Sequence, residues 1–95
     1  MFIITLRFSA NASAAPEFMA AHNEWIAQGF ADGVFHCVGS LKPAGGGAII
    51  ATDTSRDKIE ARINADPFVA EDVVNAEIIE VDVKKATPAM DALKG

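Results

Sequence analysis

The chain has 95 residues, of which 51% are hydrophobic; this is enough apolar material for one packed domain and excludes a disordered chain. Its formal net charge is −5, and its 8 basic side chains are scattered among 13 acidic ones. A nucleic acid or an anionic membrane is recognised by a basic stripe, so we expect neither as a partner.

The single cysteine, Cys37, cannot form a disulfide within the chain, and this favours a reducing compartment. The N-terminal residues lack the basic segment and the apolar run of a signal peptide, and no apolar run approaches the roughly 20 residues of a membrane span. His22 and His36 show no metal-ligand spacing with Cys37. We therefore expect a cytoplasmic protein with no metal and no other cofactor.

Alternating apolar residues predict a first strand over residues 2–8, with Arg7 on the face opposite the larger set of apolar side chains. Ser13 is expected to cap the helix that follows, and Pro16 falls in the first turn of that helix, where a missing N–H does no harm. The helix is expected to run to about Gln28 because glycines follow this residue.

The rest of the chain predicts two strands at residues 34–41 and 48–52, which a glycine-rich turn connects. A second helix is expected over residues 56–64, and a short helical turn over residues 68–72. The last strand is expected over residues 75–83, and its inward side chains are expected to be Ile79, Val81 and Val83.

The resulting order, β-α-β-β-α-β, predicts an α+β ferredoxin-like fold: a four-stranded antiparallel sheet with both helices on one face. This domain is expected to occupy residues 1–83, followed by a C-terminal tail over residues 84–95. Strands with apolar residues on both faces, such as Ile3 beside Ile4, indicate a sheet covered on both sides. We therefore expect a homodimer formed through the face that the helices leave bare.

One ionisable residue, His22, interrupts the apolar stripe of the first predicted helix, which comprises Phe18, Met19, His22, Trp25, Ile26 and Gly29. An imidazole in such a place needs a polar partner, and Asp66, in the turn after the second helix, is the best candidate. The pair has two interpretations. It is either an acid/base site in which Asp66 orients His22, or a hydrogen bond that ties the two segments together.

Four further residues are candidates for binding a small-molecule ligand. Arg7 could bind a carboxylate or form an ordinary ion pair, and Ser40 could line the mouth of a pocket. Trp25 and Phe68 could supply dry walls around His22, although a core position also explains Phe68. Asp66 has its own local explanation, because Asp before Pro commonly caps the following turn.

These residues give the chain a resemblance to the YciI-like, or YCII-related, family over about residues 1–83. The matching features are the helical His22, Gly33, the strand end Gly39-Ser40-Leu41, and the stretch Asn64-Ala65-Asp66-Pro67-Phe68-Val69-Ala70. The resemblance implies a dimeric α/β barrel with a candidate active-site pair, carried here by His22 and Asp66. Many members have Arg three residues before the histidine, where this chain has Met19, and the familiar Gly-Pro after the second strand is Gly39-Ser40 here.

The family is related to muconolactone-isomerase-type proteins and includes a member thought to eliminate chloride from a chlorinated hydroxyquinol. The resemblance therefore implies a cofactor-free enzyme that uses His22 and Asp66 for isomerase- or lyase-type chemistry on a small cyclic or aromatic-derived metabolite. The alternative is a non-catalytic module, a small-ligand-binding or structural dimer in which the pair secures the fold.

Overall fold

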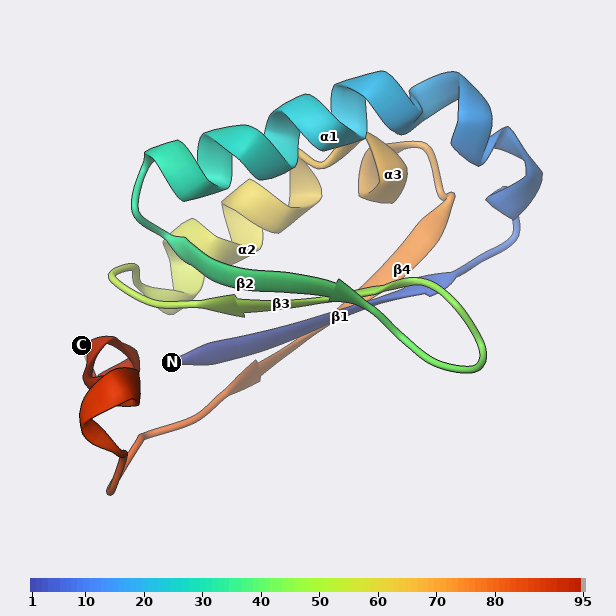
Figure 1. Ribbon diagram of the computed structural model, residues 1–95. Coiled ribbons are helices and arrows are strands. Elements are labelled where there is room, and N and C mark those ends of the chain that lie inside the picture. Colours follow the sequence, from blue (N-terminus) through green and yellow to red (C-terminus); the bar gives the residue numbers. More distant parts are fainter. Residues whose placement is uncertain (95) are drawn as a thin grey trace.

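The computed structural model describes residues 1–94, which form a four-stranded antiparallel sheet with the order β2-β3-β1-β4. The α-helices lie on one face of this sheet, as Figure 1 shows, and the ferredoxin-like α+β architecture predicted from the sequence is confirmed. The elements, in chain order, are β1 (Phe2–Phe8), η1 (Ala12–Ala14), α1 (Ala15–Ala31), β2 (Phe35–Ser40), β3 (Gly47–Ala51), α2 (Arg56–Asn64), α3 (Pro67–Ala70), β4 (Val74–Glu80) and η2 (Pro88–Lys94).

The core lies between the helices and the central strand β1. Side chains alternate along β1, so that Phe2, Ile4 and Leu6 are buried. Residues paired across an antiparallel sheet share a face, and Ile4 pairs with Ile49 on one side and with Ile78 on the other. The core is completed from the helical layer by buried side chains that include Ile59, Ile63 and Phe68.

The orientation expected for the last strand is wrong. Ile79 pairs with Ile3 and lies on the face away from the helices, where it is 43% exposed, whereas Ile78 packs against the core. Two adjacent isoleucines make the alternation of this strand ambiguous. The register of the pairing with β1 decides which of the two isoleucines faces the core, because a shift of one residue would exchange the two faces of the strand.

Helix α1 differs from its expected bounds at both ends. Its N-cap is Ala14, which makes no side-chain capping bond, and Ser13 lies in the preceding turn η1; the expected Ser13 cap is therefore wrong. The helix also continues past Gln28, because Gly29 is part of it. A Cβ at Gly29 would lie 2.1 Å from the Phe35 ring, so glycine is needed here for close packing against β2 and does not end the helix.

The C-terminal part of the helical layer is shaped by two caps. The Ser55 hydroxyl accepts a hydrogen bond from the Lys58 N–H and starts α2, and the Asp66 carboxylate accepts one from the Phe68 N–H and starts α3. Pro67 stands at the first position of α3, where its lack of an N–H costs nothing. These caps place Asp66 at the junction of α2 and α3, directly behind α1.

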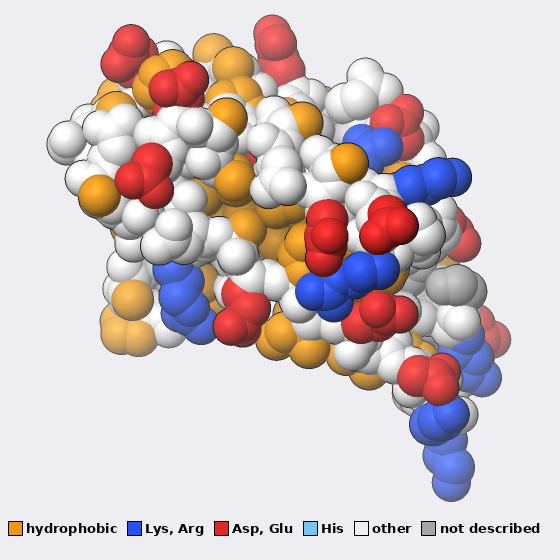
Figure 2. Space-filling model, turned by 180° about the vertical axis from the view of Figure 1, so that it is seen from behind, with side chains coloured by type: hydrophobic (Ala, Val, Ile, Leu, Met, Phe, Trp, Pro, Cys, Tyr) orange, Lys and Arg blue, Asp and Glu red, His pale blue; other side chains and the backbone are white. Residues whose placement is uncertain are grey.

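The face of the sheet away from the helices carries Ile3, Ile50 and Ile79 on three adjacent strands. Figure 2, which shows the molecule from behind, has apolar side chains along the lower edge, on the side of the sheet that no helix covers. Acidic and basic side chains are interspersed over the same view. Among residues 1–94, no helix has the length and apolar character required to cross a membrane.

Candidate active site

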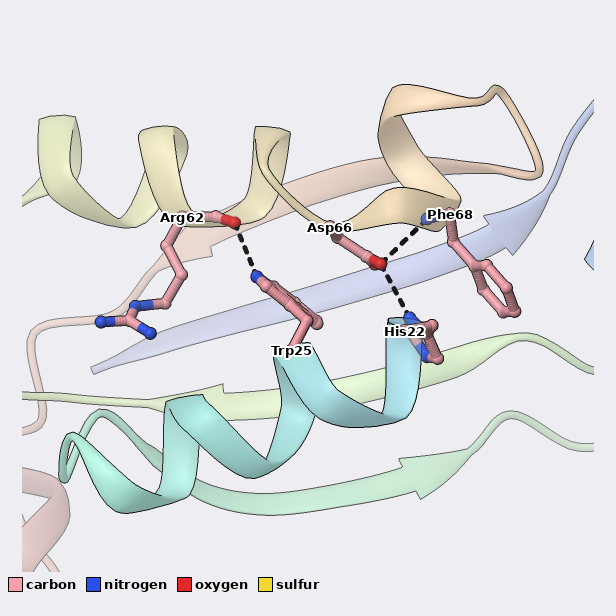
Figure 3. A network of polar contacts seen from close by, with 5 residues as sticks. All are labelled: His22, Trp25, Arg62, Asp66 and Phe68. Carbon is pink, nitrogen blue, oxygen red and sulfur yellow. Dashed lines mark hydrogen bonds and ion pairs between the residues drawn. The ribbon is translucent and has the colours of Figure 1, made fainter. Parts of the chain in front are cut away.

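His22 and Asp66 are in direct contact between α1 and the α2–α3 junction. His22 Nδ1 lies 2.7 Å from Asp66 Oδ1, with His22 only 9% and Asp66 0% exposed (Figure 3). A carboxylate only accepts hydrogen bonds, so Nδ1 carries the hydrogen of this contact when Asp66 is ionised. The partner that the sequence suggested for His22 is therefore present in the fold.

The tripeptide Asp66-Pro67-Phe68 holds the imidazole through a hydrogen bond and a stacked ring. Asp66 Oδ1 accepts the hydrogen bond from His22 and, at 2.9 Å, a second one from the Phe68 backbone N–H, which fixes the carboxylate in place. The Phe68 ring then stacks on the imidazole with 4.0 Å between ring centroids and 4° between planes. The local capping role and the partnership with His22 are thus combined in one oxygen atom of Asp66.

The other carboxylate oxygen, Asp66 Oδ2, is buried and has no hydrogen-bond partner within residues 1–94. Burying an acceptor without a partner costs free energy. His22 Nε2 is the ring nitrogen left for other contacts, since within the described chain only Nδ1 is hydrogen-bonded.

A cavity of about 510 Å³ adjoins His22 and lies between α1 and the end of the sheet where β2 and β3 are connected. Its volume is in the range of small-molecule sites. Phe68 and Ser40, two of the residues predicted from the sequence to bind a ligand, line this cavity together with His22. Met19 and Asn23, on the same stretch of α1, line it as well.

Glycines 45–47 form part of the cavity wall with backbone alone. Gly46 has φ +88°, and a Cβ at this position would lie 2.2 Å from the Leu6 carbonyl oxygen, so only glycine fits. The loop therefore passes close to the end of β1 and leaves the space beside it free of side chains.

Trp25 lies one turn after His22 and contributes to a different part of the molecule. Its Nε1–H donates a hydrogen bond of 2.9 Å to the Arg62 carbonyl (Figure 3). Its ring packs edge-on against Phe35. Trp25 lines a second cavity whose wall includes Lys58 and Arg62. Although its ring stacks on His22 at a centroid distance of 5.9 Å, it is not part of the wall of the cavity beside His22.

One charged residue of this second cavity, Arg62, forms an ion pair at the surface. Arg62 Nη2 donates to Asp32 Oδ2 at 2.9 Å. This hydrogen bond, followed by one from Gln28, holds the pKa of Asp32 below its ordinary value. Solvent screens such a pair, so it contributes little to stability.

Arg7, a predicted ligand-binding residue, and His36, the second histidine, do not line the cavity beside His22. Arg7 is exposed on β1 and points to the face of the sheet that the helices do not cover, because its position alternates with the buried Leu6. His36, on β2, contacts the Thr52 hydroxyl through Nε2. Among residues 1–94, no three His, Cys, Asp or Glu side chains gather in a group that could hold a metal ion.

Asn23 is a cavity residue that the sequence did not single out. It follows His22 directly, and consecutive residues of a helix point about 100° apart, which suggested that it faces elsewhere. Asn23 nevertheless lines the cavity together with Met19, His22 and Ile26 of the same helix. To find Asn23 from the sequence, the residues of α1 that neighbour the apolar stripe would have to be considered as cavity residues too.

A solved structure that is similar in fold is 5-chloro-2-hydroxyhydroquinone dehydrochlorinase (TftG) from Burkholderia phenoliruptrix AC1100, in complex with 2,5-dihydroxybenzoquinone. The two chains superpose with a TM-score of 0.68 at 16% identity, over 85% of this chain and 93% of the other. No curated protein sequence matches the chain. The model of the YCII-related domain matches residues 1–82, and the chain therefore belongs to this family.

Proposed function

We propose that this protein is a cofactor-free enzyme that performs isomerase- or lyase-type chemistry on a small cyclic or aromatic-derived metabolite. His22 is the general acid/base, and Asp66 orients it. The observation that carries the proposal is the arrangement of the imidazole: Nδ1 is held by a buried carboxylate, while the same ring lines a cavity of about 510 Å³.

The chemistry that this arrangement supports is proton transfer. Nε2 of a neutral His22 accepts a proton from a substrate carbon or hydroxyl, and the Asp66 carboxylate stabilises the imidazolium that forms. In an isomerisation the proton returns to another atom of the substrate. In an elimination the electron pair of the broken bond forms a new double bond, the leaving group departs as an anion, and the proton passes to solvent.

The structural neighbour supports the reaction class. It is named as a dehydrochlorinase, an elimination enzyme, and its structure holds a small quinone ring. At 16% identity the likeness establishes the fold alone, so elimination and a ring-shaped substrate are proposals for this chain, whereas the role of His22 in proton transfer is argued from its contact with Asp66 and from the cavity.

The test compares two histidine variants for chloride release from 5-chloro-2-hydroxyhydroquinone and for isomerisation of muconolactone. His22→Gln is expected to lower turnover by at least about 100-fold, since general acid–base catalysis contributes roughly that much, while its melting temperature stays near that of the unaltered protein. His36→Gln is the matched control, because His36 contacts Thr52 outside the cavity. Unaltered turnover in His22→Gln would refute the proposal.

The alternative is a non-catalytic module that binds a small ligand or serves as a structural dimer. It predicts that His22→Gln melts well below the His36→Gln control, because the pair would then serve the fold. Ring compounds that bind to the unaltered protein without any turnover would favour this alternative.

We further propose that the protein is a homodimer in which a second copy covers the face of the sheet opposite the helices. This face presents the side chains of Ile3, Ile50 and Ile79, and a buried hydroxyl, Thr5 Oγ1, has no hydrogen-bond partner within residues 1–94. A two-fold axis brings the same patch of both copies into contact, and such a contact removes the three isoleucines from water. Light scattering at micromolar concentration is expected to give twice the chain mass of 10.0 kDa; a monomer mass would contradict the proposal.

A further inference from the structure

The cavity beside His22 has an unusual wall for a site in a protein with so many charged residues. Within the described chain, none of its lining residues is Lys, Arg, Asp or Glu, although 22% of the whole sequence is charged. Its polar side chains are those of His22, Asn23 and Ser40, and most of the remaining wall is apolar side chain or glycine backbone. A ligand there meets a few hydrogen-bonding groups on a largely apolar surface.

His22 does not supply a positive charge for an anion. When its ring is protonated, it stands 2.7 Å from the Asp66 carboxylate, so the two groups together are neutral. When its ring is neutral, the buried Asp66 leaves the pair negative. In either state an anion that enters the cavity loses hydration and finds no opposite net charge, and the net charge of −5 on the chain adds a further repulsion.

The exposed Arg7 does not change this balance, because it lies on the opposite face of the sheet. At the cavity rim, one turn before His22 on the same face of α1, Met19 lines the cavity and is 43% exposed, so that its side chain reaches both the ligand space and solvent. A thioether at this position contributes apolar contact and no charge.

We infer that the cavity selects uncharged ring compounds that carry hydroxyl or carbonyl oxygens, that it rejects the corresponding carboxylates, and that Met19 is the residue that sets this selectivity. The inference rests on the proposed function for the kind of molecule, a small ring. The inference adds that this molecule is uncharged, and that Met19 is the residue that distinguishes it from a carboxylate. Asn23 and Ser40 are the side chains that hydrogen-bond the ring oxygens not held by His22.

The experiment uses two probes of the same size, 2,5-dihydroxybenzamide and 2,5-dihydroxybenzoate, which differ in charge at neutral pH. Their affinities are measured by NMR titration, with the backbone amide signals of residues 45–47 reporting occupancy of the cavity. The unaltered protein is expected to bind the amide at least about tenfold more tightly than the acid.

Met19→Arg is expected to raise the affinity for the acid by at least about tenfold, because a guanidinium at the rim pairs with the carboxylate, and to change the affinity for the amide by less than about threefold. The matched control is Met90→Arg. Met90 is 53% exposed in η2 and does not line the cavity, so this variant adds the same charge elsewhere. It is expected to leave the ratio of the two affinities unchanged.

Three results would overturn the inference: equal or tighter binding of the acid to the unaltered protein, no shift of these amide signals with either probe up to about 10 mM, and an equal gain in acid affinity in the two arginine variants. All of these are binding measurements. They are independent of turnover, so a failure of the His22→Gln test would remove the catalytic role and leave the charge selectivity standing, and the reverse also holds.

Discussion

Two hydrogen bonds, one turn apart on α1, join this helix to the segment around the α2–α3 junction. They differ in whether the side chain from α1 keeps a second atom that can form a hydrogen bond. Trp25 donates its single N–H to a backbone carbonyl and has no further polar capacity. His22 contacts Asp66 through one ring nitrogen and keeps the other, beside a cavity of about 510 Å³. The first contact is complete as a structural bond, whereas the second retains an acid/base group.

The cavities beside the two contacts also differ, because one is bordered by charged side chains and the other is not. The cavity next to Trp25 is bordered by Lys58, Arg62 and Asp53, whose charges remain in contact with solvent. The cavity next to His22 has no Lys, Arg, Asp or Glu among the described residues of its wall, and its only carboxylate neighbour, Asp66, is fully buried behind the imidazole. A surface cleft between charged side chains is common, whereas a buried hydrogen bond between histidine and aspartate beside a largely apolar cavity is the arrangement expected of a functional site.

The largest effect is expected from Asp66→Ala, which tests whether the His22 contact also supports the fold. The change removes the acceptor of His22 Nδ1 and of the Phe68 N–H, and with it the cap of α3. The free energy of unfolding is expected to fall by about 3 kcal/mol, as measured by urea denaturation with an unchanged slope.

Asp66→Asn is the matched control for this variant. The amide keeps one oxygen that can accept from Phe68 and from His22, so the loss of stability is expected to be about 1 kcal/mol. If Asp66→Ala unfolds within about 1 kcal/mol of the unaltered protein, Asp66 does not secure the fold, and the carboxylate is retained for chemistry alone.

A smaller effect is expected from Trp25→Phe, which tests the structural side of the comparison. The new ring still packs against Phe35, but the hydrogen bond to the Arg62 carbonyl is lost. One hydrogen bond between neutral groups contributes about 1 kcal/mol, so the free energy of unfolding measured by urea denaturation is expected to fall by about 1 kcal/mol. A loss as large as that in Asp66→Ala would erase the distinction between the two contacts.

Much of the candidate site followed from local patterns in the sequence. His22 stood out because it is ionisable on an apolar helical stripe, and Asp66 stood out because a carboxylate before proline caps the next turn. Helix–helix packing on one side of a ferredoxin-like sheet then made their contact plausible, and the structure has them 2.7 Å apart. Such inferences work because helix periodicity and capping act over a few residues.

Other features depended on which face of an element meets which neighbour. The sequence placed Ile79 inward and Ser13 at a helix cap, and the pairing of β1 with β4 and the extra turn η1 decided otherwise. Trp25 and Met19 share one helical stripe, yet the structure assigns Met19 to the cavity of His22 and Trp25 to the other.

The sequence by itself thus determined the order of the elements, the apolar stripe with its histidine, and the carboxylate before proline, because these depend on periods and turns that neighbouring residues set. Only the tertiary structure decided the shape and charge of the space beside His22. That space is enclosed by residues of α1, α3 and all four strands, together with a glycine loop. The relative positions of these elements depend on strand register and on close packing across the whole domain.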